Sequence, residues 1–162
     1  EEAVSNSKRL IECGASAVKL EGGISMIPQV RVIIDAGIPF VGHIGMLPQS
    51  VKEEGGYKKK GKTSEQIDRL IADAQALDDA GAIAMVLESI VPEVAAQITG
   101  LVKASTIGIG AGAGTDGQVL VTPDLLGSFP WFRPPFAKAR ADLAGETLRA
   151  VREYIAEVRL PA

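Results

Sequence analysis

The sequence of 162 residues predicts an α/β protein made of repeating strand–helix units. We expect these units to form a (β/α)8 TIM barrel, of which this chain holds the C-terminal half to two-thirds. The expected strands are short, rich in Val and Ile and nearly unalternating, which is typical of a parallel sheet buried on both faces. Polar residues also stand at the C-terminal end of every expected strand. A barrel collects its active site there, whereas a doubly wound sheet binds ligand at one switch point.

The expected elements follow one another along the chain. It opens on an amphipathic pattern with Ala3, Val4, Leu10 and Ile11 on the apolar side. Strands are expected at residues 17–20, 38–41, 83–87, 106–109 and 118–121. Each returns parallel to the last through a helical crossover, and these helices are expected at residues 24–35, 64–80 and 92–102. A helical extension at about 141–160 completes a single, incomplete barrel domain over residues 1–162.

The N-terminal strands of the barrel are expected to be missing. A (β/α)8 barrel has eight strands and typically ~250 residues, whereas four clear strands and one further candidate are found here. Glu1 is not an initiator methionine, and the chain starts inside a helical pattern. The sequence therefore predicts the later part of a barrel.

Composition limits the classes of partner. The chain is 46% hydrophobic and 23% charged, with a net charge of -3, so we expect neither nucleic acid nor an anionic membrane as the main partner. Cys13 is the only cysteine, which excludes an intrachain disulfide. No apolar run approaches the ~20 residues that cross a bilayer. A reducing, cytoplasmic compartment is the natural expectation.

Lys19 and Glu21 stand at the end of the first expected strand. Because they are two residues apart in an extended segment, their side chains point to the same side. Charges in an apolar setting are seldom buried without a partner. Gly22 and Gly23 follow and allow the backbone to approach a ligand closely. The pattern predicts a polar site at this strand end, with a purely structural ion pair as the alternative.

His43 and Glu88 follow or end the next two strands. His43 is the only histidine and lies between Gly42 and Gly45, where it either meets a ligand or is a hydrogen-bonded structural residue. Glu88 ends an apolar run, and a carboxylate there suits a general base. The alternative is that Glu88 or Ser89 caps the following helix.

A lysine-rich segment and a glycine-rich segment are further candidates for the site. Lys58–Lys60 and Lys62 lie in the long connection over residues 45–63, which is either a basic lid over the barrel mouth or a solvated charge run. The glycines of residues 108–114 resemble a dinucleotide fingerprint, but the expected long helix and acidic ribose ligand do not follow. We therefore interpret this run as a glycine-lined barrel mouth.

Together these motifs resemble the ketopantoate hydroxymethyltransferase family. The likeness covers most of the chain from Ala17 to Lys138, and the order and spacing of five motifs agree. They are residues 18–23 (VKLEGG), 42–45 (GHIG) with 48–50 (PQS), 55–57 (GGY), 87–88 (LE), and 107–112 (IGIGAG) with 116–121 (DGQVLV).

The resemblance implies a (β/α)8 barrel that transfers a one-carbon unit from 5,10-methylenetetrahydrofolate to 3-methyl-2-oxobutanoate. The product is 2-dehydropantoate, in pantothenate and coenzyme A biosynthesis, and the family uses a divalent cation, usually Mg²⁺. By resemblance, Glu88 is the catalytic proton acceptor, Lys19 and His43 bind substrate, and Glu21 is a metal ligand. Family members are large homo-oligomers, commonly decamers.

The chain also departs from the family pattern. The family's two aspartate metal ligands and a substrate-binding serine lie on earlier strands, so this chain carries one metal ligand of three. Pro92 stands four residues after Glu88 rather than three. Two alternatives stay open: a metal-dependent lyase or aldolase of the phosphoenolpyruvate and 2-oxo acid barrels, and a non-catalytic half-barrel. The chain alone is expected to be inactive.

Overall fold

The computed structural model describes residues 1–52 and 55–160. It divides the chain into two compact units, Glu1–Val119 and Leu120–Ala162, each of which is considered by itself. The second unit starts well before the helical extension expected at about 141–160. Among the described residues, no helix is long and apolar enough to cross a membrane.

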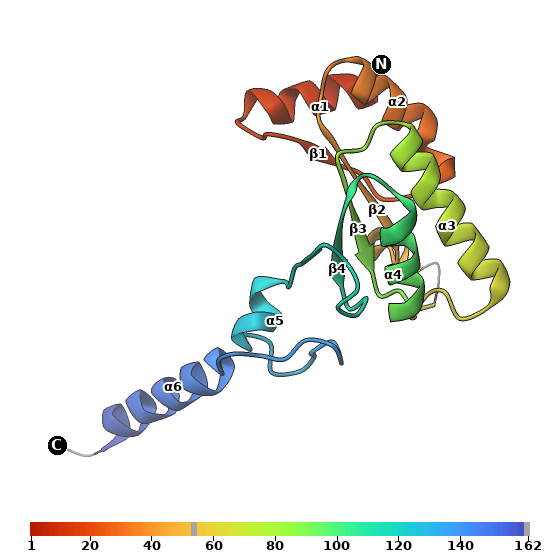
Figure 1. Cartoon of the computed structure of the whole chain (residues 1–162). Helices are drawn as coiled ribbons and strands as arrows, with labels where there is room; N and C mark the ends of the chain where they lie inside the picture. The colour runs from red at the N-terminus through yellow and green to blue at the C-terminus, as the bar shows by residue number, and fades with distance from the viewer. Residues whose placement is uncertain (53–54, 161–162) are drawn as a thin grey trace. The chain divides into compact units, whose positions relative to one another are not determined.

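The first unit is an α/β fold built on one parallel sheet, which confirms the predicted fold class at this level (Figure 1). Its five strands are β1 (Val18–Lys19), β2 (Phe40–Gly45), β3 (Ala84–Glu88), β4 (Ser105–Ile109) and β5 (Gly117–Gln118). They are hydrogen-bonded in chain order, and all pairs are parallel. These strands therefore contain no switch point of the kind that a doubly wound sheet has. Closure of the sheet into a barrel stays a prediction.

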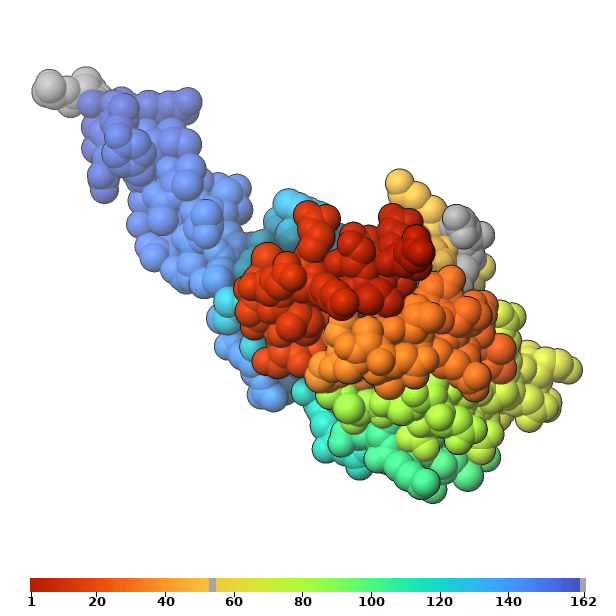
Figure 2. All heavy atoms as spheres, turned by 90° about the horizontal axis from the view of Figure 1, so that it is seen from above, coloured from red at the N-terminus to blue at the C-terminus, as the bar shows by residue number. Residues whose placement is uncertain are grey.

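Helices connect the first four strands of this sheet. They are α2 (Ile27–Asp35), α3 (Ser64–Asp79) and α4 (Pro92–Leu101), with short 3-10 turns η1 (Ile24–Met26) and η2 (Pro48–Ser50), and a further helix, α1 (Glu2–Glu12), precedes β1. Figure 2 shows α1 and α2 lying side by side, in red and orange. The start of α3 is fixed by Thr63, whose hydroxyl accepts a hydrogen bond from the backbone N–H of Gln66.

The two faces of the sheet differ in burial. Phe40, Met85 and Leu87 are fully buried in the core that the sheet shares with the helices. Val41 and Val86, which alternate with them, are only partly buried. Because neighbouring residues of a strand point to opposite faces, the first unit has one face packed by helices and one face partly open. The side chains of the candidate site belong to the open face.

Several element boundaries differ from the expectation. The second strand was expected to end at Val41, but β2 runs on to Gly45 and includes His43. The fifth strand was expected at residues 118–121 and covers only Gly117–Gln118. A short helix that was not expected, α5 (Thr122–Leu126), follows it. The long connection after β2 contains residues 53 and 54, which lie outside the described part of the chain.

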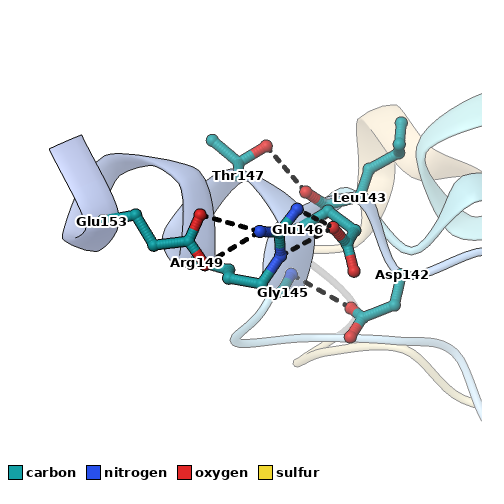
Figure 3. A network of polar contacts seen from close by, with 7 residues as sticks. All are labelled: Asp142, Leu143, Gly145, Glu146, Thr147, Arg149 and Glu153. Atoms are coloured by element: carbon teal, nitrogen blue, oxygen red, sulfur yellow. Dashed lines mark hydrogen bonds and ion pairs between the residues drawn. The ribbon is translucent and has the colours of Figure 1, made fainter.

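The second unit contains α5 and the long helix α6 (Leu143–Arg159). Figure 3 shows how α6 begins: the Asp142 carboxylate accepts a hydrogen bond from the backbone N–H of Gly145, 3.1 Å away. Arg149 then joins Glu146 and Glu153 along one side of the helix, at 2.9 and 2.8 Å. These two hydrogen bonds, to Glu146 first and then to Glu153, raise the pKa of the Arg149 guanidinium.

Candidate active site

Four side chains from three neighbouring strands meet at the C-terminal end of the sheet. Lys19 is the last residue of β1, and Glu21 stands two residues further on. His43 lies within β2, and Glu88 is the last residue of β3. The register pairs Gly45 with Glu88 and His43 with Val86. The parallel pairing of β1, β2 and β3 therefore brings all four predicted site residues together.

His43 is at the centre of this group. Its Nδ1 lies 3.1 Å from Nζ of Lys19 and 4.0 Å from Oε1 of Glu21. Its Nε2 lies 3.0 Å from Oε2 of Glu88. Lys19 and Glu21 are 3.9 Å apart, through Nζ and Oε1. The imidazole therefore links the lysine on one side to the Glu88 carboxylate on the other, while Glu21 lies beside the lysine.

The contact between His43 and Glu88 is close but poorly aligned. Although only 3.0 Å separates Nε2 from Oε2, Nε2 makes no aligned hydrogen bond within the described residues. We treat His43 and Glu88 as a pair on the basis of this distance. Hydrogen bonds in active sites are often poorly aligned before substrate binds. Side chains of His43, Glu88 and Glu21 are 4%, 13% and 14% exposed, whereas that of Lys19 is 45% exposed. The two carboxylates are thus largely shielded from water, whereas the lysine side chain faces solvent.

Three backbone features hold this arrangement. Gly22 donates its N–H to the carbonyl of His43 at 2.9 Å, which ties the segment after β1 to β2. Gly45 has a φ of +99°, and a Cβ there would collide with the carbonyl oxygen of Glu88. Glycine is required at this position on both grounds. Ser89, directly after Glu88, adopts a left-handed φ of 51° and is held by a 2.8 Å hydrogen bond from its N–H to the carbonyl of Ile109.

The alternative role of Glu88 as a helix cap is wrong. The N-cap residue of α4 is Val91, and no side chain caps that helix start. The prediction that His43 follows its strand is also wrong, because β2 continues through it to Gly45. Because His43 belongs to β2, hydrogen bonds to the neighbouring chain segments fix its backbone, which would not be the case in a loop.

Glu21 is the residue that the sequence predicted as a metal ligand. Its Oε2 accepts a hydrogen bond from the backbone N–H of Gln49 at 3.2 Å, so the loop after β2 helps to orient it. Within residues 1–52 and 55–160, no group of three or more His, Cys, Asp or Glu side chains is arranged to hold a metal ion. Mg²⁺ commonly binds through one or two carboxylates together with substrate and water. Glu21 fits such a partial role.

Sequence reasoning did not find the cavity beside this site. It has a volume of about 260 Å³, and Arg69 and Asp73 of α3 lie in its wall with Gly22 and Gly23. The carboxylate of Asp73 accepts a hydrogen bond from the backbone N–H of Ile24 at 2.8 Å. Helical periodicity placed Arg69 and Asp73 on α3, but no local pattern in the sequence shows which strand end they approach.

The arrangement defines an α/β protein in which a histidine, two carboxylates and a lysine meet at the carboxyl end of a parallel sheet. The sequence matches the model of the family described as ketopantoate hydroxymethyltransferase over residues 1–161. The chain belongs to this family.

Curated relatives agree with this assignment. The 3-methyl-2-oxobutanoate hydroxymethyltransferase of Cenarchaeum symbiosum is 53% identical over 97% of this chain and 60% of its own length. The protein of that name from Clostridium botulinum is 51% identical over 98% of this chain and 58% of its own length. The chain thus spans somewhat less than two thirds of these relatives.

A solved structure of a proposed phosphonomutase from Burkholderia cenocepacia J2315 also aligns with the chain. The TM-score is 0.49 at 14% identity, over 96% of this chain and 63% of that one. A similarity at this level does not define the fold or the function of the chain.

Proposed function

We propose that this chain carries the acid–base part of an active site that transfers a hydroxymethyl group from 5,10-methylenetetrahydrofolate to 3-methyl-2-oxobutanoate. The product is 2-dehydropantoate, and one water supplies its hydroxyl oxygen. The observation that carries the proposal is the contact series from Lys19 through His43 to Glu88. Family membership adds support and does not favour the metal-dependent lyase or aldolase considered above.

Each side chain has a distinct task in this proposal. Glu88 accepts the proton that leaves C3 of the 2-oxo acid, which makes C3 nucleophilic towards the one-carbon unit. His43 orients the Glu88 carboxylate through Nε2. The Lys19 ammonium, which faces the opening, neutralises the substrate carboxylate or the enolate charge that develops.

The cation is proposed to be Mg²⁺ or another divalent ion. Glu21 would hold it, and the positive charge of the cation would stabilise the negative charge that develops on the oxo acid. Lys19 lies 3.9 Å from the same carboxylate and balances its negative charge when no cation is bound.

The open face of the sheet supports a barrel in the complete protein. Val41 and Val86 are only partly buried there, and the curated relatives are longer than this chain. We propose that further strands cover this face, close the (β/α)8 barrel and contribute the remaining metal ligands. A cytoplasmic location and assembly as a homo-oligomer, such as a decamer, are proposed with it.

The test is product formation by the full-length protein. With 3-methyl-2-oxobutanoate and Mg²⁺, 2-dehydropantoate should form only when 5,10-methylenetetrahydrofolate is present, in equal amount to the tetrahydrofolate released. Cleavage of a 2-oxo acid without folate would instead favour a lyase. Absence of turnover in a folded, full-length protein would support the non-catalytic alternative.

A further inference from the structure

The cavity beside the candidate active site has a cationic wall. It lies where β1 and β2 end, next to the first half of α3, and Lys60, Gln66 and Arg69 contribute to its lining. The volume of about 260 Å³ suits a small polar group rather than a whole cofactor.

Two acceptor atoms of this wall are already engaged. Oε1 of Gln66 accepts hydrogen bonds from the backbone N–H groups of Gly61 and Lys62, at 3.1 and 2.9 Å. Oδ1 of Asp73 accepts from the backbone N–H of Ile24. The Arg69 guanidinium and the Gln66 amide nitrogen remain as donors, so the side of the cavity formed by these two residues favours a ligand group that accepts hydrogen bonds.

Further cations lie next to the cavity-lining residue Lys60 in the chain. Lys59 and Lys62 are exposed and flank Lys60, and the backbone N–H of Lys62 is bonded to Gln66, which also lines the cavity. Within the described residues, no ion pair involves the side chains of Lys59, Lys62 or Arg69. Their charges are therefore available to a ligand, and we refer to Lys59, Lys62 and Arg69 together as the basic rim.

The basic rim is connected to the catalytic residues through the backbone. Lys60 donates its N–H to the carbonyl of Ser89 at 2.8 Å and accepts from Val91 at 2.9 Å. Ser89 directly follows Glu88, and Gly45, which packs against Glu88, also lines the cavity. A ligand whose reacting atom is near Glu88 can therefore extend towards the basic rim.

The folate co-substrate has a shape and charge that match this arrangement. Its one-carbon unit is carried at the pterin end, and the glutamate carboxylates lie at the other end, beyond an aromatic ring. Each γ-linked glutamate adds one negative charge. With the one-carbon unit at the candidate active site, the tail must point away from it, and guanidinium and ammonium groups are the natural partners of carboxylates.

We propose that Lys59, Lys62 and Arg69 bind the γ-linked glutamate tail of the folate co-substrate, with one tail carboxylate entering the cavity beside Arg69. This inference rests on the proposed function. The proposal assigns a ligand to the basic rim. It also predicts that the protein prefers folates that carry several glutamates. Since each exposed charge pair contributes little, the effect should be largest when all three cations are removed.

A binding measurement tests the rim without turnover. Penta-γ-glutamate is titrated into the full-length protein by calorimetry at low ionic strength, and then into the variant K59Q/K62Q/R69Q. We expect affinity to fall about tenfold or more in the variant, and to fall with added salt in the wild type. The matched control R31Q/K103Q removes exposed cations from α2 and from the residues after α4 and should bind as the wild type does. Equal affinity in wild type and rim variant overturns the proposal.

A kinetic measurement separates the tail site from the proposed function. Turnover with monoglutamyl 5,10-methylenetetrahydrofolate decides the function itself. The ratio of kcat/KM for the pentaglutamyl form to that for the monoglutamyl form shows whether the basic rim binds the glutamate tail. We expect the ratio to exceed about five in the wild type and the control, and to approach one in the rim variant. A wild-type ratio near one overturns the tail site and leaves the transferase intact, whereas absence of folate-dependent turnover overturns both.

Discussion

At the scale of single residues, the site depends on one histidine that contacts both a cation and an anion. His43 is buried, and a buried polar side chain is costly unless partners surround it. Lys19 supplies a hydrogen-bond partner on one side, and on the other the Glu88 carboxylate lies within 3.0 Å of Nε2 without an aligned hydrogen bond. Because the imidazole bridges them, a change at either end alters the environment of the other, and substitutions of these residues should not be additive.

Glu88→Gln tests the proton acceptor. The amide keeps the shape of the side chain but cannot take a proton, so exchange of the C3 hydrogen of the oxo acid with deuterated solvent should slow by ~100-fold or more. Binding of metal and oxo acid should persist. Nuclear magnetic resonance of the oxo acid follows the exchange, and Glu93→Gln, exposed in the first turn of α4, is the matched control. Unchanged exchange would exclude Glu88 as the base.

Glu21→Ala and Lys19→Ala should have separable effects. Loss of the Glu21 carboxylate should weaken Mg²⁺ binding in the presence of the oxo acid by about tenfold or more, since carboxylates are the preferred ligands of this ion. Loss of Lys19 should mainly weaken binding of the oxo acid. Calorimetric titration of each ligand distinguishes the two. If Glu21→Ala binds Mg²⁺ as tightly as the wild type, Glu21 is not a ligand.

The sequence predicted one part of this site and not another. The side-by-side placement of Lys19 and Glu21 follows from the two-residue period of an extended segment, and the 3.9 Å contact agrees with it. The contact between His43 and Glu88 depends on the register that pairs Gly45 with Glu88. That register joins residues that are far apart in the sequence, so no local pattern reveals it.

At the scale of elements, local propensity explains where the predicted bounds differ from the observed ones. Gly42 and Gly45 lower the strand propensity of the segment, which explains why the sequence predicted a strand ending at Val41. Pairing with β3 overrides that weak propensity as far as Gly45. α5 was missed because its five residues are too few to show helical periodicity.

Gly45→Ala should destabilise the protein more than Gly37→Ala. Both glycines have positive φ, +99° and +77°, so each substitution costs about 1–2 kcal/mol of backbone strain. Only at Gly45 would the new methyl group also strike the carbonyl oxygen of Glu88, whereas no atom lies within 4 Å at Gly37. We expect a further loss of ~1–3 kcal/mol at Gly45, measured by urea unfolding of the full-length protein. Equal losses would show that the strand ends adjust without strain.

At the scale of the whole molecule, the first unit leaves two surfaces open. β1 is an edge strand, and the face that carries Val41 and Val86 lacks the helix cover of the other face. Open edges and apolar faces favour aggregation. We expect residues 1–162 expressed alone to be inactive and to aggregate unless a complementary N-terminal piece is supplied. A monodisperse, cooperatively melting monomer with folate-dependent turnover would contradict this.

The second unit offers a surface for self-association. Leu148, Val151, Ile155 and Val158 are each at least 41% exposed, and their spacing of three and four residues puts them on one side of α6. Arg149 forms ion pairs with Glu146 and Glu153 (Figure 3), and the helical spacing puts these three residues on the other side. Such a helix, apolar on one side and charged on the other, is typical of a packed interface.

Val151→Asp combined with Ile155→Asp should therefore dissociate the proposed homo-oligomer of the full-length protein. Placing two carboxylates in an apolar contact forfeits burial of about 1.5–3 kcal/mol per side chain and adds a desolvation cost. The midpoint concentration for assembly, measured by sedimentation velocity, should rise by at least tenfold, as follows from ~1.4 kcal/mol per factor of ten. Glu153→Gln, on the charged side of α6, should leave assembly unchanged. If the double variant assembles like the wild type, α6 does not form the interface, and any oligomer is held by another surface.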